Sequence, residues 1–291
     1  MKSCISLYSY WRRVLNNEMT QFEVIDTIKS LGIDGVELLV FDHAVPEGET
    51  MQSFVRKLHA HAVEIGLEVP ILSMDSKLYC EEPEKTLEYL CSMVDVASEL
   101  SIPLMRFDIA YKLIGNEEKK TYKAVIDKVT PYIRRLAEYS EGKGVKVCSE
   151  NHGRIIQDSY RIEELIERVD CEGYGFLCDI GNFGGVDEDC ADAVSRLLPY
   201  ICFVHAKDAF WKSGMCYDPG RGFGRTRGGN FRRATIFGHG DVPTYQILTA
   251  IKNSGYDGYV SLEFEGMEDV MSGVEISAEN LKRMLADIEK A

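Results

Sequence analysis

The sequence predicts a single α/β domain over residues 1–291, folded as a closed (β/α)8 TIM barrel. Short β-rich runs alternate with longer amphipathic runs along the chain, and such alternation gives parallel strands joined by crossover helices. The alternation yields eight strand–helix pairs, the number that closes an α/β barrel. No G-x-G-x-x-G follows the first strand, which disfavours an open dinucleotide-binding sheet.

Each strand is expected where a short apolar, β-branched run ends in polar or turn-forming residues. The expected strands are CISLYS (4–9), GVELLV (35–40), LEVPILSM (67–74), PLMRFDIA (103–110), VKVCSE (145–150), GFLCDI (175–180), CFVHAK (202–207) and YVSLEFE (259–265).

Each helix is expected where apolar residues recur at helical spacing. In 19–32, Phe22, Ile25, Ile28 and Leu31 recur every three residues and Gly32 ends the run. Pro131 is expected to kink the long fourth helix. The expected helices are 19–32, 50–66, 85–100, 119–144, 161–169, 191–198, 244–255 and 278–290.

One segment breaks this rhythm. Residues 209–238 form a predicted loop of about 30 residues between the seventh strand and its helix, and loops of that length in compact domains are usually functional. Beyond it, Asp241 is expected to be the N-cap of the next helix, with Pro243 in its first turn.

The composition of the chain disfavours several classes of binding partner. The formal net charge of −14 disfavours nucleic acid and anionic membranes. The N-terminus lacks the apolar core of a signal peptide, and no run reaches the roughly 18 apolar residues of a membrane span. Nine cysteines without C-x-x-C indicate reduced thiols and a cytoplasmic location. The oligomeric state stays open, a homo-oligomer included.

The ends of the last four strands carry the main functional signal. Glu150, Asp179, His205 and Glu263 stand at equivalent positions, and catalytic groups of α/β barrels collect at the C-terminal strand ends. Singly, each has an ordinary alternative: Asp179 as a turn residue, His205 as a core histidine. Together, three carboxylates and one imidazole predict a divalent metal site, best suited to Mn²⁺ or Mg²⁺, with Co²⁺ or Zn²⁺ as alternatives.

Strand parity adds neighbours, because side chains two residues apart share a face. His152 is expected beside Glu150 as a catalytic group, and Lys207 beside His205 as a substrate ligand. Arg106 and Glu37 are further substrate-binding candidates, although paired charges inside a barrel would explain them equally well. Tyr8 and Tyr10 would either wall a sugar pocket or simply pack.

The long loop is rich in arginine. Its basic residues are Arg221, Arg225, Arg227, Arg232 and Arg233. They form either a solvated loop or a lid that clamps an anionic or large substrate, since barrel phosphate sites often use the loops after strands seven and eight. Arg221 is taken as a substrate ligand on the second interpretation.

The motifs GVELL, SENHG, GFLCDIGN, FVHAKD, GHGDVP and GYDGYVSLEFEG resemble the xylose isomerase-like TIM-barrel superfamily, and more closely its sugar phosphate isomerase/epimerase branch. The resemblance implies that Glu150, Asp179, His205 and Glu263 bind the metal. In the ketose 3-epimerases, the first and last glutamates also exchange the proton. Those epimerases carry histidine where this chain has Asn182, a predicted substrate contact. They also carry an arginine soon after the ligand histidine. The H-x-K-D and E-N-H forms of this chain are instead similar to those of less specialised members of the superfamily and of inosose dehydratases.

Two reactions fit this site. One is isomerisation or epimerisation of a small sugar through an enediolate, with Glu150 and Glu263 serving opposite faces. The other is a lyase reaction on a keto-sugar, keto-inositol or 3-keto-glycoside, with His152 as acid or base. An abasic-site endonuclease is disfavoured by only six histidines and the acidic charge. A non-catalytic sugar-binding or partner subunit would be favoured if the purified protein held no metal.

Overall fold

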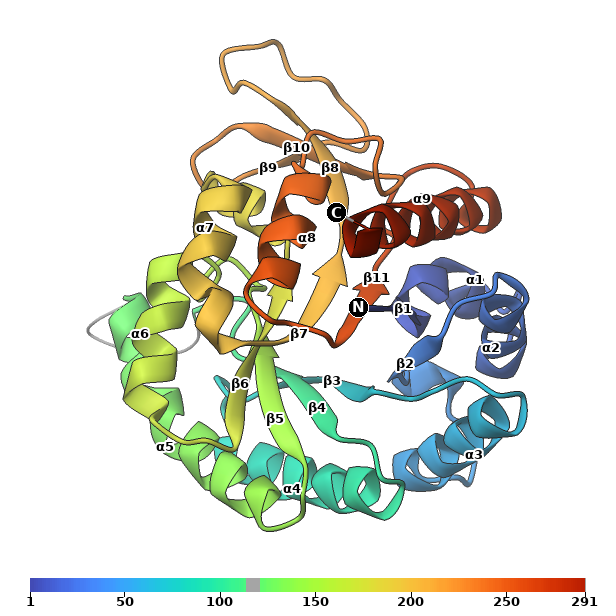
Figure 1. Cartoon of the computed structure of the whole chain (residues 1–291). Coiled ribbons are helices and arrows are strands. Elements are labelled where there is room, and N and C mark those ends of the chain that lie inside the picture. The colour runs from blue at the N-terminus through green and yellow to red at the C-terminus, as the bar shows by residue number, and fades with distance from the viewer. Residues whose placement is uncertain (114–120, 291) are drawn as a thin grey trace.

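The structure, a computed structural model, describes residues 1–113 and 121–290. Eight parallel strands close a barrel in the order β1-β11-β7-β6-β5-β4-β3-β2 (Figure 1), which confirms the predicted single TIM-barrel domain. The barrel strands are β1 (Lys2–Ser6), β2 (Gly35–Leu39), β3 (Ile71–Lys77), β4 (Leu104–Asp108), β5 (Lys146–Glu150), β6 (Tyr174–Asp179), β7 (Ile201–Ala206) and β11 (Tyr259–Leu262).

Within the described residues, eight helices follow these strands and surround the barrel (Figure 1). They are α2 (Gln21–Ser30), α3 (Met51–Glu64), α4 (Pro83–Glu99), α5 (Tyr122–Glu141), α6 (Ser159–Val169), α7 (Cys190–Leu197), α8 (Thr244–Asn253) and α9 (Val270–Lys290). Their apolar stripes pack inward; Ile25 and Ile28 of α2, for example, are fully buried. Helix α5 continues through Pro131, and residues 119–120 of the expected helix lie outside the described residues.

Three barrel strands differ from the sequence prediction by three residues or more at one end, and the last of them, β11, ends at Leu262 instead of Glu265. The first strand ends at Ser6, whose hydroxyl accepts the Tyr8 N–H at 3.3 Å, and the chain turns into a 3-10 helix (Leu7–Tyr10) followed by α1 (Trp11–Leu15). Tyr10 is therefore buried in the core, and only Tyr8 of the two tyrosines reaches a cavity. The third strand runs over 71–77 instead of 67–74, because Pro70 has no N–H to donate to a strand ladder.

The segment expected as a loop contains a small antiparallel sheet in the order β8-β10-β9. Its strands are β8 (Asp208–Lys212), β9 (Gly224–Arg225) and β10 (Phe231–Thr235), and Figure 1 shows it continuing from β7 beyond the barrel. The Asp208 carboxylate anchors the sheet by accepting backbone N–H groups of Gly238 and Gly240 at 2.9 and 2.8 Å. Asp241 accepts the Trp211 N–H at 2.8 Å and caps no helix, so α8 begins after Pro243.

Candidate metal centre

The four predicted ligands converge at one end of the barrel. Glu150 and Asp179 are the last residues of β5 and β6. His205 is the penultimate residue of β7, and Glu263 directly follows β11. The Glu263 N–H donates to the Ala206 carbonyl at 3.1 Å, which extends the strand pairing by one residue. All four side chains are buried, and one ligand atom from each lies within 4.8 Å of the others. Such a cluster could bind a metal ion.

His205 is oriented from behind by Glu37. The His205 Nε2 lies 2.9 Å from Glu37 Oε2, and Glu37 also accepts the hydroxyls of Ser73 and Ser261 at 2.5 and 2.7 Å. Glu37 is fully buried and lines neither of the two cavities described below. The structure places Glu37 behind His205, in the way that carboxylates commonly support metal-binding histidines, and its predicted substrate contact stays a prediction.

The other ring nitrogen of His205 has no hydrogen-bond partner among the described residues. This buried Nδ1 lies 3.8 Å from Glu150 Oε1 and 3.8 Å from Glu263 Oε1. A buried polar atom without a partner is costly. With Nε2 toward Glu37, Nδ1 faces two carboxylates, and a ring that has given up its Nδ1 proton would join them in binding a divalent cation.

Asp179 is fixed by the turn that follows β6. Its Oδ1 accepts the N–H groups of Gly181 and Asn182 at 2.9 and 3.0 Å. Its buried Oδ2 makes no hydrogen bond to any described residue, although it lies 3.0 Å from the Lys207 ammonium. A Cβ at Gly181 would stand 2.7 Å from the Lys207 carbonyl oxygen, so only glycine lets the chain turn here.

Glu150 is held by two neighbours, one on each oxygen. Arg106 lies 2.7 Å from Oε2 and the Asn182 amide donates to Oε1 at 2.9 Å. Burial alone would raise the pKa of Glu150, but the charges of Arg106 and His205 outweigh it and lower that pKa well below its usual value. The structure thus places Arg106 and Asn182 as positioning neighbours of Glu150, and both also line a cavity.

Glu263 has a different environment. Its Oε2 lies 2.5 Å from the Lys207 ammonium, which is 3.5 Å from Glu265. Burial raises the pKa of Glu263, and the Lys207 charge opposes that shift only in part. Among the two glutamates of the cluster, Glu263 is therefore the better proton acceptor.

His152 lies at the opening of the site, with 38% of its side chain exposed. Its Nδ1 is 3.4 Å from Asp108 Oδ1, and the Tyr111 hydroxyl donates to the other Asp108 oxygen at 2.7 Å. Burial lowers the pKa of His152, but Asp108 and Glu150 outweigh burial and raise it. A histidine in this position could exchange a proton with a bound molecule.

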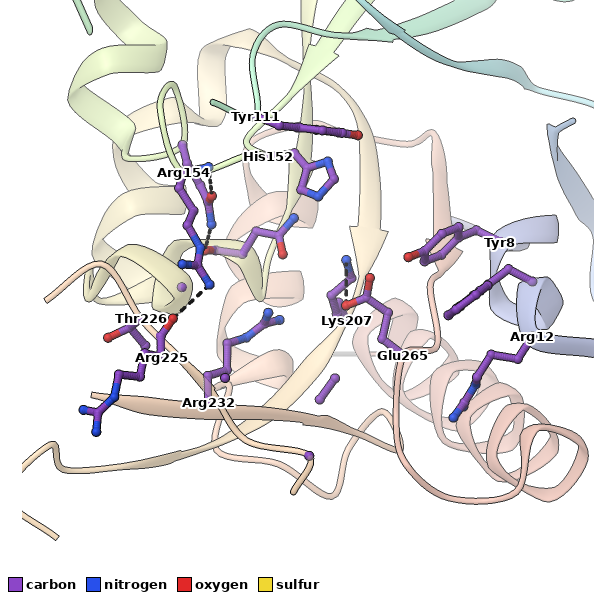
Figure 2. A pocket seen from close by; sticks show the side chains of 18 residues that line it. Tyr8, Arg12, Tyr111, His152, Arg154, Lys207, Arg225, Thr226, Arg232 and Glu265 are labelled. Atoms are coloured by element: carbon purple, nitrogen blue, oxygen red, sulfur yellow. Dashed lines mark hydrogen bonds and ion pairs between the residues drawn. The ribbon is translucent and has the colours of Figure 1, made fainter. Parts of the chain in front are cut away.

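Two adjoining cavities lead to the cluster. The inner one, about 280 Å³, is lined by Arg106, Glu150 and Glu263 among others. The outer one, about 530 Å³, borders the small sheet, from which Arg232 reaches into it (Figure 2). The residues that line both are Tyr8, Tyr111, His152, Lys207 and Glu265. These volumes suit a small molecule.

Several lining residues escaped the sequence analysis. Tyr111, Arg154 and Gln157 come from loops after β4 and β5, where strand parity gives no guidance. Arg221, by contrast, is exposed and does not line the outer cavity, whereas Arg225 and Arg232 do.

Comparison with known proteins gives consistent matches. The family model described as xylose isomerase-like TIM barrel matches residues 25–286. An inosose isomerase of Halalkalibacterium halodurans is 23% identical over 263 residues, covering 85% of this chain and 86% of that protein. An inosose dehydratase of Clostridium perfringens is 25% identical over 173 residues, covering 58% and 54%.

A crystal structure of IOLI protein with a bound zinc atom superposes with a TM-score of 0.71 at 15% identity, covering 99% and 98% of the two chains. That similarity supports the fold. Within residues 1–113 and 121–290, no helix has the length and hydropathy that crossing a membrane requires.

Proposed function

The chain belongs to the xylose isomerase-like TIM-barrel family, and from that premise we propose that it is a divalent-metal-dependent sugar isomerase or epimerase. The substrate is a ketose, aldose or related hydroxy-carbonyl sugar. The observation that carries the proposal is the buried Nδ1 of His205, which has no hydrogen-bond partner among the described residues and lies 3.8 Å from both Glu150 and Glu263.

The residues that would hold the ion are Glu150, Asp179, His205 and Glu263. Oxygen-rich sites with one imidazole favour Mn²⁺ or Mg²⁺, and the zinc-containing neighbour keeps Zn²⁺ as an alternative. When bound, the ion would polarise the substrate carbonyl and stabilise the negative charge of an enediolate.

Glu263 is the base in this proposal. Buried at the cavity, it takes the proton from the carbon next to the carbonyl, and Lys207 at 2.5 Å from its Oε2 steadies the carboxylate. Glu150 stands three strands away around the barrel, so it faces the substrate from another side. Proton removal by one glutamate and return by the other gives epimerisation, and return to the neighbouring carbon gives isomerisation.

A dehydratase is the second candidate, and the pairing of His152 with Asp108 favours it. Elimination needs an acid for the departing hydroxyl besides the base. With Nδ1 toward Asp108 at 3.4 Å, Nε2 of His152 is left to give that proton. The similarity to an inosose dehydratase points the same way.

A pair of variants decides between the two reactions. Hydroxy-carbonyl sugars are incubated with the Mn²⁺-loaded protein in D₂O, and deuterium incorporation and elimination products are followed by NMR. If the protein is an epimerase, the turnover of Glu263→Gln should fall about 10²–10⁴-fold, and the turnover of His152→Gln should fall less. If His152→Gln abolishes turnover while metal-loaded Glu263→Gln stays active, the epimerase proposal is wrong.

A further inference from the structure

The outer cavity has a charge opposite to that of the whole protein. The chain carries a net charge of −14, yet five basic side chains and a single carboxylate, Glu265, line this cavity. The basic residues are Arg12, Arg154, Lys207, Arg225 and Arg232. A concave site lined by one sign of charge raises the local concentration of the opposite charge.

Most of these basic groups already have protein partners. Arg12 donates to the Gly266 carbonyl at 2.5 Å and Arg154 to the Arg225 carbonyl at 2.9 Å. Arg225 donates to the Gly229 carbonyl at 3.2 Å, with its guanidinium 4.4 Å from the Phe231 ring. Lys207 is bound by the carboxylates of the inner site. These residues supply positive potential but few free donors.

Arg232 is different. It comes from β10, and its Nε and Nη2 are buried and make no hydrogen bond within the described part of the chain. Figure 2 shows its side chain reaching from the small sheet into the cavity, on the side of Lys207. Arg232 is partly exposed as a whole, but its two buried nitrogens lack the acceptors that a carboxylate or phosphate would supply. Among the residues that line the cavity, only Glu265 carries a negative charge.

We propose that the outer cavity is a subsite for an anionic group of the substrate, a carboxylate or a phosphate, with Arg232 as its principal ligand. The inference rests on the proposed function: Lys207 and His152 line both cavities, so one substrate would occupy the inner and the outer cavity together. The hydroxy-carbonyl end of such a substrate lies at the metal cluster, and its anionic end lies under β10. The substrate class is therefore an acidic sugar derivative.

The neighbouring residue is a matched control. Arg233 follows Arg232 on the same strand and so points to the other face. Its guanidinium lies 5.1 Å from the Phe210 ring and 5.3 Å from the Phe223 ring, and it does not line the outer cavity. Replacing Arg233 removes the same charge from the same sheet without touching the subsite.

Binding is measured by calorimetry with the Mg²⁺-loaded full chain at low ionic strength. The probes are D-fructose, D-fructose 6-phosphate and D-glucuronate, and the proteins are wild type, Arg232→Gln, Arg232→Lys and Arg233→Gln, each checked for folding by circular dichroism. We expect at least one charged probe to bind about 10- to 100-fold more tightly than D-fructose, as charge-assisted hydrogen bonds allow. The preferred charged probe identifies the anion as phosphate or carboxylate.

Arg232→Gln should abolish that preference, Arg232→Lys should keep part of it, and Arg233→Gln should leave it intact. Equal affinity for all three probes, no binding of either charged probe, or equal losses in Arg232→Gln and Arg233→Gln would overturn the subsite. Binding needs no turnover, so the two proposals fail separately. Proton exchange on sugars without anion preference leaves the isomerase proposal standing, and anion-dependent binding without any turnover leaves the subsite standing.

Discussion

Glu37 provides a graded test of how the metal centre is held. Its Oε2 accepts from His205 Nε2 at 2.9 Å and from Ser261 at 2.7 Å, while Oε1 accepts from Ser73 at 2.5 Å. Glu37→Gln keeps one oxygen for His205 and turns its amide toward a serine hydroxyl, which can accept a hydrogen bond. The orientation of the imidazole should survive, and only the negative charge behind it is lost.

Loss of such a supporting partner typically costs 10- to 100-fold in metal affinity. We therefore expect Glu37→Gln to raise the Kd for Mn²⁺ about 10-fold, or ~1.4 kcal/mol. Glu37→Ala, which also frees the ring of His205, should raise it about 100-fold, or ~2.7 kcal/mol. Competition with a chromophoric chelator measures both values.

The control is Glu68→Gln, which removes the same charge from an exposed ion pair with Lys2 and should not change metal affinity. Unchanged Mn²⁺ affinity in folded Glu37→Gln and Glu37→Ala would refute the role assigned to this carboxylate, and with it the orientation of His205.

Two further predictions concern stability. Gly153→Ala should lower the free energy of unfolding more than Gly220→Ala does, as measured by denaturant unfolding. Both glycines have a positive φ, 84° and 81°, which costs about 1–2 kcal/mol for alanine. Only at Gly153 would the added Cβ also clash, because it would stand 2.3 Å from the Ala110 carbonyl oxygen. Equal losses would show that the clash is relieved freely. Mn²⁺ at 100 times its Kd should raise the free energy of unfolding of the wild type by about 2.7 kcal/mol, and with it the melting temperature. The melting temperature of His205→Ala should not change. An equal rise in that variant would show that the ion binds elsewhere.

The strand ends were predictable because barrel geometry and residue type point to the same positions. Glu150, Asp179 and His205 each lie at or beside the end of a parallel strand, and such ends meet at one rim. Glu263 follows the same rule although its strand is assigned only to Leu262, since its N–H still pairs with β7.

The supporting contacts were harder to infer. The alternation of side chains along β2 predicts that Glu37 faces the barrel interior. Its contact with His205 depends on how strands β2, β3 and β11 pack around it, which the local sequence does not reveal. The same holds for the small sheet, because β8 and β10 pair across a long arginine- and glycine-rich connection. Its pairing decides that Arg232 lines the cavity and Arg221 does not.

Metal content is the most direct test of the central claim that the four strand-end residues form one divalent-metal site. Wild type, Asp179→Ala and His205→Ala are incubated with Mn²⁺, freed of excess ion by gel filtration and measured by elemental analysis, with circular dichroism to confirm folding. We predict about one ion per chain in the wild type and none in either folded variant. Full occupancy in both variants would contradict the claim.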